Sequence, residues 1–494
     1  MGSVEVGVGV FSSATGVLAA VLGLTLFIVP ASAATESIDS TRLRDAVTVV
    51  GIREHQRALQ SIADANNGTR ASGTSGYQAS ADYVRDRLVA AGYQVVMQPF
   101  QFPFFAETAP AVLQRADSNA RAYSPGTEVR TMGFSTSGDV TAPVQPIDVT
   151  LPPAPAPSST SGCELTDFAG FTTGNVALLQ RGTCPFTDKA RNAQTAGASA
   201  VIIFNEGQAD RRETVSGTLA RPGIVNIPVL GTSFTVGAEL AEAAGTPVRV
   251  AARTTSELRD TVNVIADSPT GRDDRVVVVG AHLDSVIEGP GINDNGSGTA
   301  TILEIAEQLA ALRTEPRNTL RFALWGAEER GLLGSEHYVA TLPLDQRSQI
   351  AVNLNFDMLG SPNFVGFVFD GDGSSSPPAG PSGSGAVERV FTEYFAAEGL
   401  AAAPTPFTGR SDYGPFVRVG IPAGGLFSGA EGIKTPEQAA LFGGTAGLPY
   451  DSCYHKACDT VDNVSEPALD QLGDAAAHAV LLFALTTSEI RAGR

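Results

Sequence analysis

The chain has 494 residues, more than one ordinary hydrophobic core organises, so two globular domains with processing segments are expected. Apolar residues make up 43% and charged residues 17%, a composition that excludes a disordered polymer. The formal net charge of -19 makes nucleic acid and anionic membrane surfaces poor partners, because they carry charge of the same sign.

Residues 1–33 have the features of an export signal. An apolar run from Ala14 to Val29 is shorter than the ~20 residues that span a bilayer, and small residues up to Ala33 follow it. The stretch before the run carries Glu5 and neither Lys nor Arg, which leaves a membrane anchor as the alternative. The sequence shows no second apolar run that would cross a membrane, so we expect a secreted, extracellular protein.

The four cysteines form two local pairs, Cys163 with Cys184 and Cys453 with Cys458. An even number of cysteines in an exported chain predicts disulfides. A zinc finger would need two closely spaced pairs, and the first pair does not supply one.

Elements alternate in the first half of the chain. Apolar residues spaced as on one helix face predict a helix over 80–92, and a strand is predicted over 93–102. From about residue 126, Thr, Ser, Gly and Pro predict a linker or exposed loop. A strand, a helix and a strand then follow, at 175–180, 188–196 and 200–204.

A second regular block runs from about residue 261 to the end and alternates buried apolar strands with helices. The strands are predicted at 275–279, 320–325 and 352–356, and the helices at 299–312 and 388–398. This alternation predicts an α/β fold with a mostly parallel central sheet and helices on both faces.

Polar residues follow each of these strands, where ligands bind in open α/β sheets. His282 follows the first strand, Glu329 the second and Asp357 the third, and a glycine-rich loop carries Asp294 between the first two. Each has an ordinary explanation alone: a hydrogen-bonded histidine, a solvated acidic turn, a strand end or a helix cap. With His455, however, they form a cluster of imidazoles and carboxylates that repel one another unless cations neutralise them. This donor set favours zinc, and two metals sharing a carboxylate can polarise a carbonyl and activate a water.

Five motifs in a fixed order resemble those of the secreted double-zinc aminopeptidases, whose clan also contains glutamate carboxypeptidase and the transferrin receptor. The motifs are Ala281-His282-Leu283-Asp284-Ser285, Asn293-Asp294-Asn295-Gly296-Ser297-Gly298, Trp325-Gly326-Ala327-Glu328-Glu329, Asn355-Phe356-Asp357-Met358 and Cys453-Tyr454-His455-Lys456-Ala457-Cys458-Asp459. The resemblance covers about 61–102 and 261 to the carboxyl end, and it implies the zinc exopeptidase fold.

The resemblance also implies two bound zinc ions. His282 and Asp357 would hold one ion, Glu329 and His455 the other, and Asp294 would bridge them. Glu328 is the implied general base, Asp284 orients His282, and Tyr454 donates to the developing oxyanion. Arg410 and Phe427 fall in motifs that resemble the family's substrate pocket.

The middle of the chain resembles a protease-associated domain, a small β-rich α+β module. The similarity lies in Gly162-Cys163, Asp167-Phe168, Arg181 to Phe186 and Lys189 to Ala198. This insert is expected at 127–256, dividing the peptidase domain into 34–126 and 257–494. It carries no catalytic residue, and its implied role is to cover the cleft or to select substrates.

Some of the other polar residues have two competing interpretations, and the remaining histidines need no functional one. Asp470 and Asp474 lie one helical turn apart, and the resemblance implies calcium there, while a solvated acidic face explains them equally. His55, His337 and His478 fall in predicted helices and are interpreted as ordinary satisfied histidines.

The sequence therefore predicts a monomeric zinc aminopeptidase that releases amino-terminal residues, large apolar ones such as Leu, from peptides or proteins with a free amino terminus. Another amide hydrolase of the clan, such as a carboxypeptidase, and a metal-free binding module of the same fold remain alternatives. A serine hydrolase is disfavoured because the sequence has no Gly-x-Ser-x-Gly.

Overall fold

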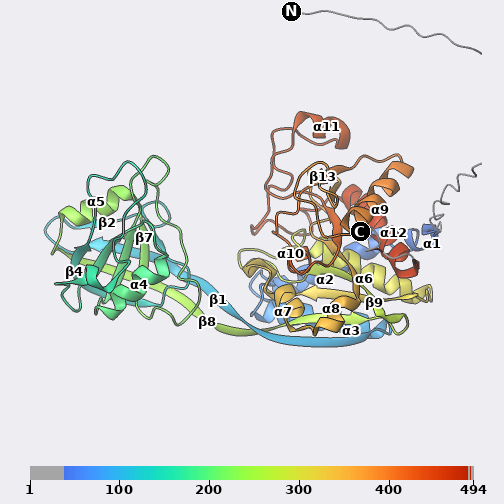
Figure 1. The fold of residues 1–494 in the computed structure, drawn as a ribbon, viewed down its shortest axis with the longest axis horizontal. Coiled ribbons are helices and arrows are strands. Elements are labelled where there is room, and N and C mark those ends of the chain that lie inside the picture. Colours follow the sequence, from blue (N-terminus) through green and yellow to red (C-terminus); the bar gives the residue numbers. More distant parts are fainter. Residues whose placement is uncertain (1–37, 488–489, 491–494) are drawn as a thin grey trace, which may run out of the picture. The chain divides into compact units, whose positions relative to one another are not determined.

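The computed structural model describes residues 38–487 and 490 (Figure 1). The predicted export signal at 1–33 lies outside the described residues. The strands of the central sheet are β1 (Gln94–Arg115), β8 (Pro247–Asp267), β9 (Arg272–His282), β10 (Asn318–Trp325), β11 (Ile350–Phe356), β12 (Phe367–Phe369), β13 (Ala403–Thr405) and β14 (Ala423–Phe427). Strands β14, β11, β9 and β10 are successive parallel neighbours, and β8 and β1 continue the sheet antiparallel. The predicted α/β fold with a mostly parallel sheet is confirmed.

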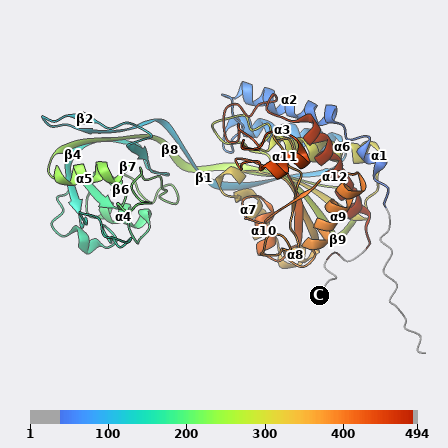
Figure 2. The same ribbon diagram turned by 90° about the horizontal axis from the view of Figure 1, so that it is seen from above.

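Helices cover both faces of this sheet (Figure 2). They are α1 (Thr41–Arg44), α2 (Val49–Ala65), α3 (Ser75–Ala90), α6 (Gly296–Ala311), α7 (Leu333–Thr341), α8 (Leu344–Gln349), α9 (Ser384–Ala397), α10 (Tyr413–Arg418), α11 (Pro436–Phe442) and α12 (Glu466–Leu485). One core joins the sheet to α2, α3, α6, α9 and α12, and a second core on the other face joins it to α7 and α10.

The valine run of β9 explains why this strand lies at the centre. Val277 and Val279 belong to the first core, while Val276 and Val278 belong to the second. Successive side chains of a strand point to opposite faces, so a continuous apolar run suits a strand that is covered on both sides.

Helix α12 is long and apolar enough to span a membrane by length and composition. Two thirds of it (67%) is buried inside the protein, which makes it a core helix. The expectation that the sequence holds no second run of this kind is wrong by length and composition.

The inserted segment has a sheet and two small cores of its own. Its elements are β2 (Arg121–Ala122), β3 (Val129–Thr131), β4 (Gly138–Ile147), η1 (Leu165–Phe168), β5 (Val176–Gln180), α4 (Phe186–Thr195), β6 (Ala200–Phe204), β7 (Val229–Thr232) and α5 (Phe234–Glu242). The predicted Cys163–Cys184 disulfide is present. Strands β4, β5, β6 and β7 run parallel as successive neighbours.

One sequence prediction about this region is confirmed but too short, and another is wrong. The strand expected at 93–102 continues to Arg115 as β1, and the stretch expected to be a linker contains β4. Both strands pair with β8, a partner far away in the sequence, and such pairing overrides a local composition rich in Pro, Gly and Thr. The insert boundary expected at residue 256 therefore falls inside a continuous strand, β8.

Candidate metal centre and substrate pocket

Three neighbouring strands deliver side chains to one edge of the sheet. His282 is the last residue of β9, and Asp357 follows directly after β11. Glu329 lies in the short turn η2 (Glu328–Arg330), just beyond β10. Because β11, β9 and β10 are parallel neighbours, their carboxyl ends meet, and the predicted convergence is confirmed.

Asp294 reaches the same place from the loop before α6. The N-cap of α6 is Asn295, whose side-chain oxygen accepts the N–H of Gly298 at 2.9 Å, so capping does not occupy Asp294. The buried carboxylate of Asp459 accepts the main-chain N–H groups of Asn293 at 2.8 Å and Asp294 at 3.0 Å. These bonds fix the loop and leave the Asp294 side chain available.

His455 lies in a short loop closed by the Cys453–Cys458 disulfide, which confirms the predicted pairing. Its φ of 56° belongs to the left-handed region that residues other than glycine rarely adopt. Such a conformation persists only where the surroundings impose it. The ring of Tyr454 stacks on the imidazole with 3.8 Å between the ring centroids.

The two imidazoles meet at Asp294. His282 Nε2 lies 3.2 Å from Asp294 Oδ1 and 3.2 Å from Asp357 Oδ1. His455 Nε2 lies 3.1 Å from Asp294 Oδ2 and 3.1 Å from Glu329 Oε2. Each imidazole thus faces two carboxylates, and Asp294 is common to both groups.

Negative charge dominates the electrostatics here. Burial lowers the pKa of His282, but Glu328 and the other carboxylates outweigh burial and raise it well above its usual value. Burial likewise lowers the pKa of His455, while hydrogen bonds to Asp294 and Glu329 raise it to about 10. Burial, followed by the charge of Asp294, raises the pKa of Glu329 to about 7. The negative charge of the site therefore attracts cations, and in the absence of other cations it favours protons on these side chains.

The same residues fit divalent cations. Glu329 Oε1 is buried and makes no hydrogen bond within the described part of the chain, and Asp294 Oδ2 faces only the His455 nitrogen. A buried acceptor without a partner costs ~1–3 kcal/mol, which a bound cation would remove. Ligand atoms of His282, Asp294 and Glu329 lie within 4.8 Å of one another, and imidazole with carboxylate is the donor set of zinc.

Glu328 and Glu329 are adjacent and point to different imidazoles. Glu328 Oε2 lies 4.0 Å from His282 Nε2, whereas Glu329 Oε2 approaches His455. Burial raises the pKa of Glu328 well above its usual value, and the charges of Asp412 and Glu329 add to this effect. Glu328 is therefore a carboxyl group that can hold a proton beside the cluster.

Asp284 contacts His282 differently from the expectation. The imidazole Nδ1 lies 3.0 Å from the main-chain carbonyl of Asp284, whereas the nearest carboxylate oxygen is 3.8 Å away. That oxygen accepts the N–H of Glu328 at 3.1 Å. The carboxylate thus holds the turn of Glu328, and the main chain of Asp284 orients the imidazole.

A pocket of about 330 Å³ opens beside this cluster. Its apolar wall includes Phe427, which stacks on Phe367 with 5.9 Å between centroids. Arg410 also lines it, with Nη1 2.8 Å from Glu431 Oε1 and Nη2 3.3 Å from the hydroxyl oxygen of Tyr454. Arg410, Phe427 and Tyr454 are thus brought together at the pocket, as expected.

Two supporting residues escaped the sequence interpretation. Ser411 donates to Asp357 Oδ2 at 2.6 Å and accepts from the amide of Asn355 at 2.8 Å, so it orients a carboxylate of the cluster. The buried guanidinium of Arg70 donates to the main-chain carbonyls of Leu283, Pro290 and Gly291. Ser411 stands beside Arg410 in a motif already noted, but no local pattern marks Arg70.

Imidazoles and carboxylates paired at the carboxyl edge of a parallel sheet, beside an apolar pocket, define a metal-dependent hydrolase. Residues 263–480 match the model of peptidase family M28, and residues 140–240 match the PA domain. The chain is 45% identical to an aminopeptidase of Pseudomonas aeruginosa over 87% of its own length and 80% of the relative. It is 37% identical to leucine aminopeptidase 2 of Trichophyton equinum over 90% of this chain and 85% of that one.

Solved structures show the same fold. A zinc aminopeptidase from Bacillus subtilis superposes with a TM-score of 0.61 at 26% identity, covering 90% of this chain and 97% of that one. An aminopeptidase from an Aneurinibacillus strain gives a TM-score of 0.66 at 24% identity, covering 91% and 97%. The chain belongs to peptidase family M28, and it is a metallo-aminopeptidase with an inserted PA domain.

Proposed function

We propose that this aminopeptidase works with two zinc ions. His282 and Asp357 would hold one, His455 and Glu329 the other, and Asp294 both. The observation that carries the proposal is the pair of imidazoles sharing Asp294 at 3.2 and 3.1 Å. When bound, the zinc ions supply Lewis-acid polarisation of the peptide carbonyl and lower the pKa of water.

The residues around the proposed zinc ions would carry out proton transfer, oxyanion stabilisation and substrate binding. Glu328 takes the proton of the attacking water at its carboxylate and passes it to the leaving amine. Burial raises the pKa of the Tyr454 hydroxyl, so this group stays protonated and donates to the developing oxyanion. Arg410, held by Glu431, lies beside that hydroxyl and would donate to a backbone carbonyl of the substrate. Asp284 keeps His282 and the turn of Glu328 in place.

Substrate preference follows from charge and shape. The carboxylates around Glu328 and Asp357 attract the ammonium group of a free amino terminus. The aromatic wall at Phe427 and Phe367 accepts a large apolar first side chain, with Leu the preferred residue. The leucine aminopeptidase relatives support this choice.

A comparison of free and blocked substrates tests the proposal. Leucine p-nitroanilide and peptides with amino-terminal Leu should be hydrolysed, while the same compounds with an acetylated amino group should resist. Elemental analysis of the active enzyme should find at least two zinc ions per chain. Equal hydrolysis of acetylated and free compounds, or release of carboxyl-terminal residues, would refute the exopeptidase assignment.

We also propose that the protein is exported and acts as a monomer. The two disulfides suit an oxidising compartment, and the export signal is proposed at residues 1–33. The PA insert, proposed at 127–256, would control access to the cleft or select substrates.

The position of Arg44 bears on the choice between a calcium site and an acidic surface at Asp470 and Asp474. Its Nη1 lies 3.8 Å from Asp474 Oδ2, so a guanidinium already supplies positive charge there. Burial raises the pKa of Asp474 to about 6, and the charge of Arg44 opposes this shift. This arrangement favours an arginine-paired acidic face over a calcium site. The melting temperature should then be the same in calcium and in a calcium chelator, and a calcium-dependent rise would restore the calcium site.

A further inference from the structure

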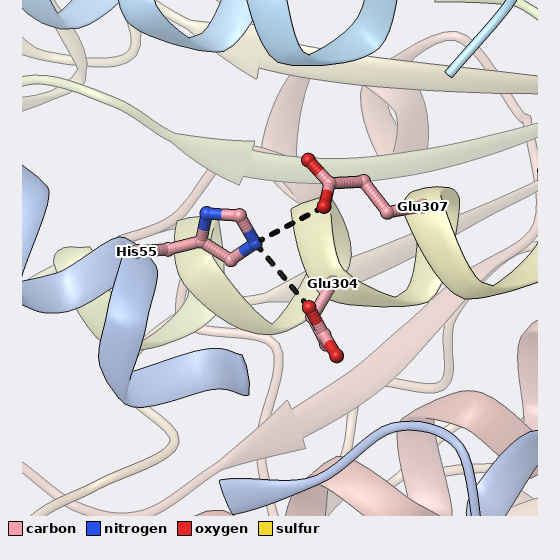
Figure 3. A group of neighbouring side chains, drawn as sticks. All are labelled: His55, Glu304 and Glu307. Atoms are coloured by element: carbon pink, nitrogen blue, oxygen red, sulfur yellow. Dashed lines mark ion pairs between the residues drawn. The ribbon is translucent and has the colours of Figure 1, made fainter. Parts of the chain in front are cut away.

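A second histidine-carboxylate cluster lies between helices α2 and α6 (Figure 3). His55 of α2 faces Glu304 and Glu307, which occupy neighbouring turns of α6. The imidazole Nε2 lies 3.4 Å from Glu304 Oε2 and 3.8 Å from Glu307 Oε2. The three ligand atoms lie within 4.8 Å of one another.

His55 is not the satisfied histidine that the sequence suggested. It is 1% exposed, and its Nε2 makes no hydrogen bond within residues 38–487. The other ring nitrogen, Nδ1, lies 2.8 Å from the hydroxyl oxygen of Tyr83. One nitrogen is therefore anchored, and the other is aimed between two carboxylates.

The charges around Nε2 do not balance. Glu304 is 4% exposed, and the amide of Gln308 donates to its Oε1. Arg87 donates to both oxygens of Glu307 and also lies 3.7 Å from Glu54. One guanidinium thus faces Glu54 and Glu307, while buried Glu304 has no guanidinium or ammonium partner among the ion pairs of the described residues. A buried carboxylate needs a nearby positive charge.

The backbone is shaped around the Glu304 carboxylate. A Cβ at Gly51, on α2, would lie 2.2 Å from Glu304 Oε1 and 2.8 Å from Oε2. Any other residue at Gly51 would force the Glu304 carboxylate to move. The Glu304 carboxylate thus occupies the space that a side chain at Gly51 would take.

We propose that His55, Glu304 and Glu307 form a third metal site, which binds a divalent cation of the zinc type. Imidazole nitrogen with carboxylate oxygens selects such ions over calcium or magnesium. Two ligand atoms on one tetrahedral zinc, each at about 2.1 Å, lie about 3.4 Å apart, close to the observed spacing of Nε2 and Glu304. The site is separate from the catalytic centre and does not rest on the proposed function.

Outer partners complete this site. A metal at Nε2 requires the proton on Nδ1, where it is donated to the Tyr83 oxygen, the arrangement common behind metal-binding histidines. Arg87 holds Glu307 in place while an oxygen lone pair stays free for the metal. Glu304 lies roughly 12 Å along α6 from its first residue, Gly296. The cation would therefore clamp α2 to the helix that follows Asp294.

Metal content of the whole enzyme tests the proposal. Chelator-stripped protein is dialysed against excess zinc, washed and measured by elemental analysis, with folding checked by circular dichroism. Wild type and the control Glu54→Gln should bind about one zinc ion more than Glu304→Gln and His55→Gln. All four should keep the same kcat on leucine p-nitroanilide, because none of these residues touches the catalytic centre. Equal zinc content in wild type and both site variants would overturn the proposal.

A second measurement does not depend on the variants. Crystals of the wild-type enzyme grown with zinc should show an anomalous difference peak, at the zinc absorption edge, between His55 Nε2 and the Glu304 carboxylate. Peaks at the catalytic centre without one at His55 would overturn the third site and leave the catalytic proposal intact.

Discussion

Glu328 and Glu329 offer a sharp test because they are adjacent, isosteric with glutamine, and assigned different work. Glu328 lies 4.0 Å from His282 and is proposed to carry the proton, while Glu329 lies 3.1 Å from His455 and is proposed to hold a metal. Glu328→Gln keeps the main-chain N–H bond to Asp284, because that bond involves no side-chain atom of Glu328. The substitution should therefore remove the base without unfolding the turn.

The expected magnitudes differ for the two variants. A positioned general base is worth ~10²–10⁴ in rate, or about 3–5 kcal/mol of barrier, so Glu328→Gln should lose that much in kcat and keep its zinc. Glu329 would be one of three ligands at its proposed metal position, and even outer partners of a ligand are worth ~10–100-fold in affinity. Glu329→Gln should lose at least ~100-fold in zinc affinity at one position, and activity with it.

The assay pairs kcat on leucine p-nitroanilide with zinc content by elemental analysis, each measured at several free zinc concentrations. Excess zinc should rescue part of the activity of Glu329→Gln and none of that of Glu328→Gln. Circular dichroism of both variants controls for folding. Zinc loss in Glu328→Gln together with retention in Glu329→Gln would mean that the two roles are exchanged.

Three further predictions concern supporting structure. Replacing Cys453 and Cys458 by Ser opens a loop of few residues, so the free energy of unfolding should fall by only about 2 kcal/mol. The zinc affinity should fall at least ~10-fold. Thermal unfolding and zinc titration measure the two effects, and an unchanged zinc affinity would contradict the prediction. Phe105 and Ser256 are paired across β1 and β8, so the insert between them can be removed and the two residues joined by an Asn-Gly turn. The shortened enzyme should fold and keep its full zinc content. Loss of zinc would place a ligand in the insert. Arg70→Met leaves three buried carbonyls without their donor. The free energy of unfolding, measured with urea, should fall by about 3–5 kcal/mol. A loss below about 1 kcal/mol would show that water replaces the guanidinium.

The sequence predicted the catalytic edge well because the relevant information is local. A short, buried run of valines favours a central strand, and the residue after such a strand stands at the carboxyl edge of a parallel sheet. His282 and Asp357 were placed by this reasoning alone. Asp294 was singled out by its glycine-rich loop, and His455 was counted with the cluster by residue type. Only the family resemblance assigned these two residues to particular zinc ions, because their loops have no period that fixes where a side chain points.

Features that depend on distant partners could not be predicted in the same way. Strand β1 contains Pro99, Pro103 and Pro110, which read locally as interruptions. They are tolerated because β1 pairs with β8 on one side and is an edge strand over most of its length. Arg70 and His55 were missed for a related reason. Their partners lie more than 200 residues away in the chain, and a helix pattern shows only that a residue is buried.

His55 and His282 show how the two kinds of site differ in what surrounds them. His282 stands at an edge with a pocket beside it, so a cation there is open to water and substrate. His55 is enclosed between two helices, with Tyr83 and Arg87 behind its cluster, and it does not line the substrate pocket. A metal with every position filled by protein and fixed waters stabilises a fold, whereas a metal with an open position does chemistry. If both proposals hold, the same donor types serve two different purposes, and access to solvent distinguishes the two sites.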